Sequence, residues 1–226
     1  MSARCFSARP VLIEVKPGAA VPIGLLSVAF ALSSGSGTSS SLVASAAVVG
    51  GVGGALSLLL HELGHVVAAR RLDGVRPVRV SLLWIGAGTT FEGAYRGGRD
   101  QALVAAGGPA ASLAFALSLL LASLLPLPRP LQLGLFGLAL LNGAIALVSL
   151  LPMHPLDGHK LLVGALWRAC GSEQRARSSL RRLARAGFPV EAVASALLFA
   201  EKPFLGVVVV GCAVPVLAQR VLVSRA

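Results

Sequence analysis

Residues 42–71 read LVASAAVVGGVGGALSLLLHELGHVVAARR, an apolar run of helical length that ends in two arginines. Crossing the hydrocarbon core of a membrane takes about 20 predominantly apolar residues, and this run is longer than that. His61, Glu62 and His65 interrupt it near its end. Ionisable side chains are costly inside a membrane and usually mark a functional site. The stretch therefore predicts a membrane-spanning helix that carries a chemical centre.

The composition of the 226-residue chain favours a lipid bilayer as its solvent. Apolar residues make up 55% and charged residues 13%, with a mean hydropathy of +0.81. Soluble domains usually carry about 25% charged residues. The net charge of +11 comes from arginines and lysines in short runs between apolar stretches, as in loops that orient membrane spans. We therefore predict an integral membrane protein and no nucleic-acid partner.

The other apolar stretches predict further spans in one membrane domain, residues 1–226. We expect an all-α polytopic fold of about five to six transmembrane helices. A polar and basic leader at 1–19 precedes the first apolar segment at 20–33. Later spans are expected at about 101–125, 131–151 and 204–223.

Residues 78–95 differ from these spans, because they are rich in β-branched and aromatic residues and in glycine. That composition predicts a strand or hairpin. We expect a small membrane-associated β-hairpin whose backbone hydrogen bonds are satisfied by protein or water.

The distribution of charge predicts the orientation. A basic segment at about 168–187 is expected in the cytoplasm, together with the N-terminus and the active-site side. The Leu, Ala, Val and Arg-rich composition suggests a GC-rich bacterial genome, and we expect the protein in the bacterial plasma membrane.

The spacing of the two histidines predicts a metal site. Residues four apart lie one turn above each other on a helix, so both imidazoles face the same way. Such a pair can hold one Zn²⁺ through ring nitrogens. Glu62 would then lie beside the metal and take a proton from water, as in other His-Glu-x-x-His sites. We predict one zinc ion per chain and Glu62 as the catalytic base.

A third protein ligand is needed, since two histidines leave zinc short of its usual set. Asp157 follows a predicted span, and Pro155 and Gly158 restrict its local backbone. His154 and His159 in the same segment would bind zinc as readily through neutral imidazole. The residues alone leave the choice among these three open.

Three motifs together resemble the site-2 protease family of intramembrane zinc metalloproteases. They are His-Glu-Leu-Gly-His at 61–65, Gly-Pro at 108–109 opening a later span, and Leu-Pro-Met-His-Pro-Leu-Asp-Gly at 151–158. The resemblance covers about residues 42–165. It implies that Asp157 is the third ligand and that substrates are transmembrane proteins cut in or near a span. It also implies that the strand-like segment 78–91 lies at the active site, where it could hold an unwound substrate by strand addition.

The chain departs from the family pattern at a few positions. The family commonly has asparagine directly before Leu-Leu-Pro, where this chain has Ser149. Asn142 lies seven residues earlier, two helical turns away. Asn142 and Ser149 are therefore both candidates to support the oxyanion or the substrate. His154 and His159 also depart from the pattern and are candidates for secondary roles.

Two other functions fit parts of the sequence. A catalytically inactive relative that binds membrane partners is the main alternative, and the altered Ser149 is its only support. A metal transporter would need ionisable groups along a pathway, and none is visible in the first, third or fifth predicted spans. The sequence indicates no particular substrate, triggering signal or oligomeric state.

Overall fold

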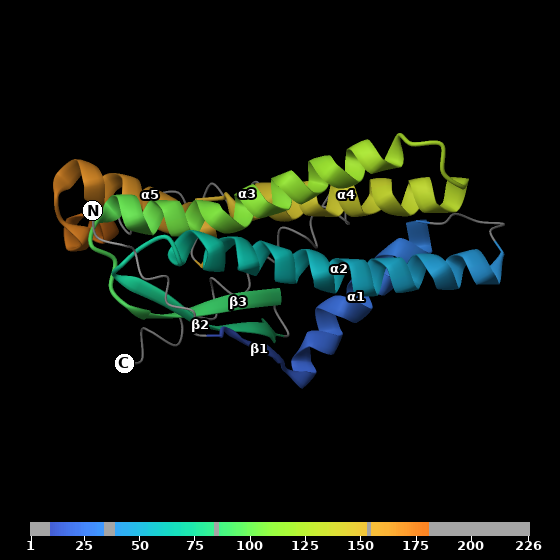
Figure 1. Ribbon diagram of the computed structural model, residues 1–226, viewed down its shortest axis with the longest axis horizontal. Helices are drawn as coiled ribbons and strands as arrows, with labels where there is room; N and C mark the ends of the chain where they lie inside the picture. Colours follow the sequence, from blue (N-terminus) through green and yellow to red (C-terminus); the bar gives the residue numbers. More distant parts are fainter. Residues whose placement is uncertain (1–9, 34–38, 84–85, 153–154, 181–226) are drawn as a thin grey trace, which may run out of the picture. The chain divides into compact units, whose positions relative to one another are not determined.

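The computed structural model describes residues 10–33, 39–83, 86–152 and 155–180, which are mostly helical with one small sheet (Figure 1). They belong to two compact units. The first is drawn from Met1–Arg96 and Leu103–Leu150, and the second from Gly97–Ala102 and Leu151–Ala226. The predicted C-terminal span at 204–223 lies outside the described residues.

Long apolar helices dominate the first unit. They are α1 (Ala20–Ser33), α2 (Ser40–Ala69), α3 (Gly98–Ser123), which begins in the second unit, and α4 (Arg129–Ser149). Of the described helices, α2, α3 and α4 are long and apolar enough to cross a membrane. The 14 residues of α1 extend only about 21 Å, less than the roughly 30 Å hydrocarbon core. The expected count of five to six spans stays a prediction.

A three-stranded sheet accompanies these helices, in the order β1-β2-β3. Strands β2 (Val75–Leu83) and β3 (Gly86–Gly93) form an antiparallel hairpin, as residues 78–95 predict. Strand β1 (Leu12–Val15) runs parallel to β2 and comes from the polar and basic leader, for which no strand was predicted. Its pairing is non-local: Glu14 forms a 3.2 Å ion pair with Arg79, 65 residues further along the chain.

Helix α2 is the central element of this unit, in contact with α1, α4, β2 and β3. Glycine permits its closest approaches. A Cβ atom on Gly50 would lie 2.5 Å from the carbonyl oxygen of Leu26 in α1. Gly64 likewise packs against Gly107 of α3, where a Cβ atom on Gly107 would lie 2.5 Å from the Gly64 carbonyl oxygen. Small residues let membrane helices approach in this way, and here they bring α3 against the part of α2 that carries the histidines.

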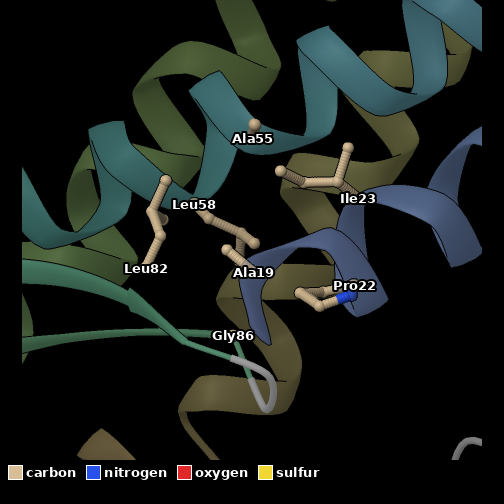
Figure 2. A pocket seen from close by; sticks show the side chains of 7 residues that line it. All are labelled: Ala19, Pro22, Ile23, Ala55, Leu58, Leu82 and Gly86. Atoms are coloured by element: carbon tan, nitrogen blue, oxygen red, sulfur yellow. The ribbon is translucent and has the colours of Figure 1, made fainter. Parts of the chain in front are cut away.

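The sheet packs on the C-terminal part of α2 through a small core. Ala69, Val75 and Val104 are buried there, and Phe91 of β3 packs against them. A separate hollow lies between α1, α2 and the hairpin (Figure 2). Its lining is apolar throughout: Ala19, Pro22, Ile23, Ala55, Leu58, Leu82 and Gly86. It offers no group that binds a metal or transfers a proton, so the chemistry lies elsewhere.

The second unit is built around α5 (Asp157–Cys170). The start of α3 packs closely on it, since a Cβ atom on Gly164 would lie 2.6 Å from the Gly98 carbonyl oxygen. Gln101 donates a 3.2 Å hydrogen bond to the Lys160 carbonyl oxygen. Helix α5 ends at Cys170 and is followed by Gly171, whose left-handed conformation is common at helix C-termini. The expected basic segment is partly visible, with residues 173–180 helical and 181–187 outside the described residues.

Candidate metal centre

The two histidines of the predicted site lie on successive turns of α2 and are both buried. Their ring centroids are 5.1 Å apart, and the ring planes are nearly perpendicular. The helix therefore brings His61 and His65 together, as their spacing of four predicts.

Each imidazole is held through its Nδ1 atom by a group on α3. His65 Nδ1 lies 2.7 Å from the carbonyl oxygen of Val104. A carbonyl can only accept, so Nδ1 carries the proton and Nε2 keeps its lone pair for a ligand bond. The backbone N–H of Gly108 lies 3.3 Å from the same Nδ1, but a protonated Nδ1 cannot accept a hydrogen bond, so the shorter contact with Val104 decides the tautomer. His61 Nδ1 lies 2.9 Å from the Ser112 hydroxyl, which can accept a bond of the same kind. Such outer partners orient metal-binding imidazoles.

The Nε2 atoms of both histidines face Gly108. A Cβ atom on Gly108 would lie 2.6 Å from His61 Nε2 and closer still to His65 Nε2. Any side chain at this position would therefore occupy the space beside both nitrogens. The Gly-Pro motif at 108–109 thus leaves room in which the two imidazoles can share a ligand.

The Ser112 contact predicts a loss of metal affinity in Ser112→Ala, because His61 would lose the partner that orients its ring. Outer-shell changes of this kind typically cost about 10- to 100-fold in metal affinity. Competition with a chromogenic zinc chelator measures the effect on purified protein. Ser118→Ala is the control, since Ser118 is exposed and donates only to the Ala114 carbonyl of its own helix. Equal affinities in both variants would contradict an orienting role for Ser112.

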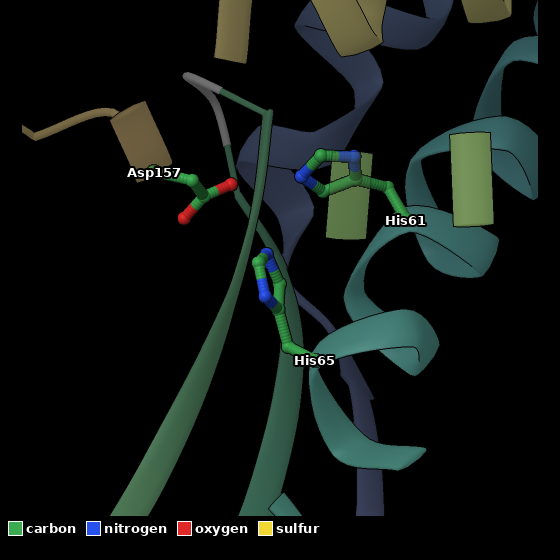
Figure 3. A group of neighbouring side chains, drawn as sticks. All are labelled: His61, His65 and Asp157. Atoms are coloured by element: carbon green, nitrogen blue, oxygen red, sulfur yellow. The ribbon is translucent and has the colours of Figure 1, made fainter. Parts of the chain in front are cut away.

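Asp157 is the first residue of α5 and is buried. Its Oδ1 atom accepts a 3.0 Å hydrogen bond from Lys160 Nζ. Ligand atoms of His61, His65 and Asp157 all lie within 4.8 Å of one another, so this group could hold a metal ion (Figure 3). Two imidazole nitrogens and one carboxylate oxygen are a ligand set typical of catalytic zinc.

Glu62 lies between the two histidines in sequence and is also buried. Its Oε2 atom accepts a 2.6 Å hydrogen bond from the Thr89 hydroxyl of β3. In the described part of the chain, Glu62 is not a member of the potential metal-ligand group. That placement suits a proton acceptor beside the metal better than a ligand.

Asn142 and Ser149, the predicted oxyanion or substrate supports, are both buried on α4. The Asn142 amide nitrogen donates to Ser57 Oγ and to the Leu138 carbonyl, both at 2.8 Å. Ser149 donates to the Ala146 carbonyl of its own helix at 2.9 Å. The Asn142 amide thus ties α4 to α2 one turn before His61. Its oxyanion role stays a prediction, and that role requires Asn142 to exchange one of these bonds for the substrate.

Two predicted candidates, His154 and His159, remain, and two contacts of the site were not predicted. His154 lies outside the described residues, and His159 is half-buried in the first turn of α5. Sequence reasoning missed Ser112 and Thr89, which contact His61 and Glu62. The only sequence signal for Ser112 is its position as a polar residue in an apolar span, three residues after the Gly-Pro motif. For Thr89, the sequence gives no signal beyond its place in the predicted hairpin.

Two relatives that are similar to the chain in sequence are named as zinc metalloproteases. The chain is 39% identical over 160 residues to "Putative zinc metalloprotease Rip3" of Mycobacterium tuberculosis, which covers 67% of this chain and 39% of that protein. It is 32% identical over 120 residues to "Putative zinc metalloprotease sll0528" of Synechocystis, covering 53% of this chain and 31% of that protein. The match thus spans well under half the length of either relative. No protein-family profile matches the chain.

The fold is similar to that of the site-2 protease from Methanocaldococcus jannaschii, with a TM-score of 0.57 and 20% identity. The likeness covers 88% of this chain and 86% of that one. Fold and site therefore define a protein with membrane-spanning helices and a potential metal group of two histidines and an aspartate. Together with the metalloprotease relatives, they show that the chain belongs to the site-2 protease family.

Proposed function

We propose that this protein is an intramembrane zinc endopeptidase that hydrolyses peptide bonds in or near transmembrane segments of other membrane proteins. The observation that carries the proposal is the buried group of His61, His65 and Asp157, with Glu62 adjacent on a helix able to cross a membrane. Fold similarity and the metalloprotease relatives support the same reaction class.

Each residue has a role in this proposal. His61, His65 and Asp157 would hold the zinc ion, one per chain. Bound zinc would supply a Lewis acid that acidifies water and polarises a carbonyl group. Glu62 takes the proton of the attacking water and returns it to the nitrogen of the leaving amine. Lys160 pairs with Asp157 Oδ1, which restrains the carboxylate.

The position of the site along α2 supports a location near one membrane surface. His61 lies 21 residues after Ser40, the start of the helix, a distance of about 30 Å along its axis. That is close to the thickness of the hydrocarbon core. Arg70 and Arg71 follow the helix, and basic loops favour the cytoplasm. We infer a bacterial plasma membrane protein whose N-terminus and active site face the cytoplasm.

Strand β3 indicates that the substrate binds as an extended peptide. Among the described residues it pairs only with β2, so its other edge has backbone groups available to an extended peptide. Strand addition of this kind binds peptides through main-chain hydrogen bonds. A transmembrane helix must unwind before it can pair in this way. We therefore propose substrates whose spans contain glycine, proline or asparagine, which weaken helices.

Zinc analysis of detergent-purified protein tests the metal site. We expect about one zinc per chain in the wild type and much less in His61→Ala and Asp157→Ala, because each variant removes a ligand. Asp73→Ala is the matched control, since Asp73 is exposed and pairs with Arg96. Metal content by mass spectrometry is the measurement, with circular dichroism to check folding.

The outcomes separate the possible ligand sets. Full zinc in Asp157→Ala would exclude Asp157 and leave His154 or His159 as the third ligand. Absence of zinc from well-folded wild-type protein would contradict the proposed metalloprotease.

A further inference from the structure

Thr89 makes a short hydrogen bond to the proposed catalytic base. Its hydroxyl lies 2.6 Å from Glu62 Oε2, within the range of bonds donated to a charged carboxylate. The backbone carbonyl of Glu62 is also near this hydroxyl, but at 3.5 Å it is too distant to compete. The single hydroxyl proton of Thr89 therefore goes to the carboxylate.

The register of the sheet determines which threonine reaches Glu62. Thr89 is paired with Val80 of β2, and residues directly opposite each other in a sheet share a face. Val80 is fully buried, so that face is the covered one. Thr90 follows on the opposite face and is exposed. Two adjacent threonines thus differ in whether they face the base.

A glutamate base needs such a partner because its side chain has several freely rotating bonds. In the described part of the chain, the hydrogen bond from Thr89 fixes the Glu62 carboxylate. The donor comes from a different element, β3, rather than from α2 itself. The orientation of the base therefore depends on how the hairpin packs against the helix.

We propose that Thr89 is a positioning residue for Glu62, holding its carboxylate in the orientation that accepts a proton from water. The inference rests on the proposed function. Because β3 is also the strand proposed to pair with the substrate, one element would hold both the peptide and the base. Thr89 acts through Glu62 and does not itself touch the reacting atoms.

The first test uses zinc-free protein and needs no catalytic activity. Infrared difference spectra between each protein and its Glu62→Gln counterpart isolate the carboxylate band of Glu62. We expect Thr89→Val, which keeps the side-chain shape but lacks the hydroxyl, to shift that band. Thr89→Ser keeps the hydroxyl and should leave it near the wild-type position. Thr90→Val is the matched control and should leave it unchanged.

The second test follows cleavage of a detergent-solubilised, single-span peptide with a central Asn-Gly-Pro sequence and a fluorophore-quencher pair. We expect Thr89→Val to lower kcat about 10- to 100-fold, the cost of losing an outer hydrogen bond to a charged group. KM should stay within about twofold, since the loss concerns chemistry and not substrate binding. Zinc content should match that of the wild type, and Thr89→Ser and Thr90→Val should retain kcat.

The outcomes distinguish this inference from the proposed function. An unshifted carboxylate band in Thr89→Val would overturn it whether or not the protein cleaves peptides. A raised KM with unchanged kcat would assign Thr89 to substrate binding instead. If Thr89→Val does not fold, a Thr89→Ser variant with low kcat would still refute the inference. A wild-type protein that binds zinc without cleaving the peptide, while the band shifts as expected, would count against the proposed function alone.

Discussion

Glu62→Gln is expected to abolish peptide cleavage while zinc stays bound. Glutamine has almost the same shape as glutamate, and its amide oxygen can still accept the hydrogen bond from Thr89. It has no basic oxygen with which to take a proton from water. A positioned general base typically contributes about 10²- to 10⁴-fold to the rate, so cleavage should fall by at least that order. The fluorogenic single-span peptide and zinc analysis of the same preparation measure the two properties together.

Glu92→Gln is the matched control for this variant. Glu92 is exposed on β3, three residues after Thr89, so the same chemical change there should leave cleavage intact. Loss of zinc in Glu62→Gln would make Glu62 a ligand rather than a base. Equal cleavage by wild type and Glu62→Gln would remove the general-base assignment. A zinc-loaded wild type that cleaves no substrate would favour the catalytically inactive relative.

The helices and the metal motif could be predicted because their signals are local in sequence. A long apolar run defines α2, and a spacing of four places both histidines on one face of it. The hairpin also has a local signal, since β-branched residues and glycines gather in one short stretch. In each case the residues that determine the element are the ones that form it.

The contacts that complete the site lacked such a signal, because they join segments far apart in the chain. Ser112 meets His61 across 51 residues, and Thr89 meets Glu62 across 27. Nothing in the sequence distinguishes these two residues from the other serines and threonines. Only the packing of α3 and β3 against α2 brings them to His61 and Glu62. Strand β1 was missed for the same reason, as its four residues form a strand only through pairing with β2.

Asn142 illustrates a different limit of sequence reasoning. Its position two turns before Ser149 could be read from helical periodicity, and both residues are buried on α4 as that reading requires. Periodicity indicates a direction but not a partner. The structure adds the partner, Ser57 of α2, at 2.8 Å. The amide therefore has a structural bond that any role toward the substrate must first break.

Gly108→Ala is expected to lower zinc affinity by about 5- to 150-fold. The added methyl group would lie 2.6 Å from His61 Nε2 and closer to His65 Nε2, so both imidazoles would have to move. Overpacking of this kind costs about 1–3 kcal/mol, and 1.4 kcal/mol corresponds to a tenfold change in affinity. Zinc competition titrations measure the affinity, and the fluorogenic peptide measures the accompanying loss of cleavage.

Helix propensity alone predicts that Gly108→Ala stabilises the protein. Alanine stabilises a helix interior by about 1 kcal/mol relative to glycine, so Gly108→Ala should not weaken α3 itself. Gly143→Ala on α4 isolates that propensity effect, because a Cβ atom there meets nothing within 4 Å. It should keep full zinc affinity with unchanged or higher thermal stability. Equal zinc affinity in the two variants would mean that the histidine Nε2 atoms do not meet beside Gly108, and the proposed ligand geometry would then be wrong.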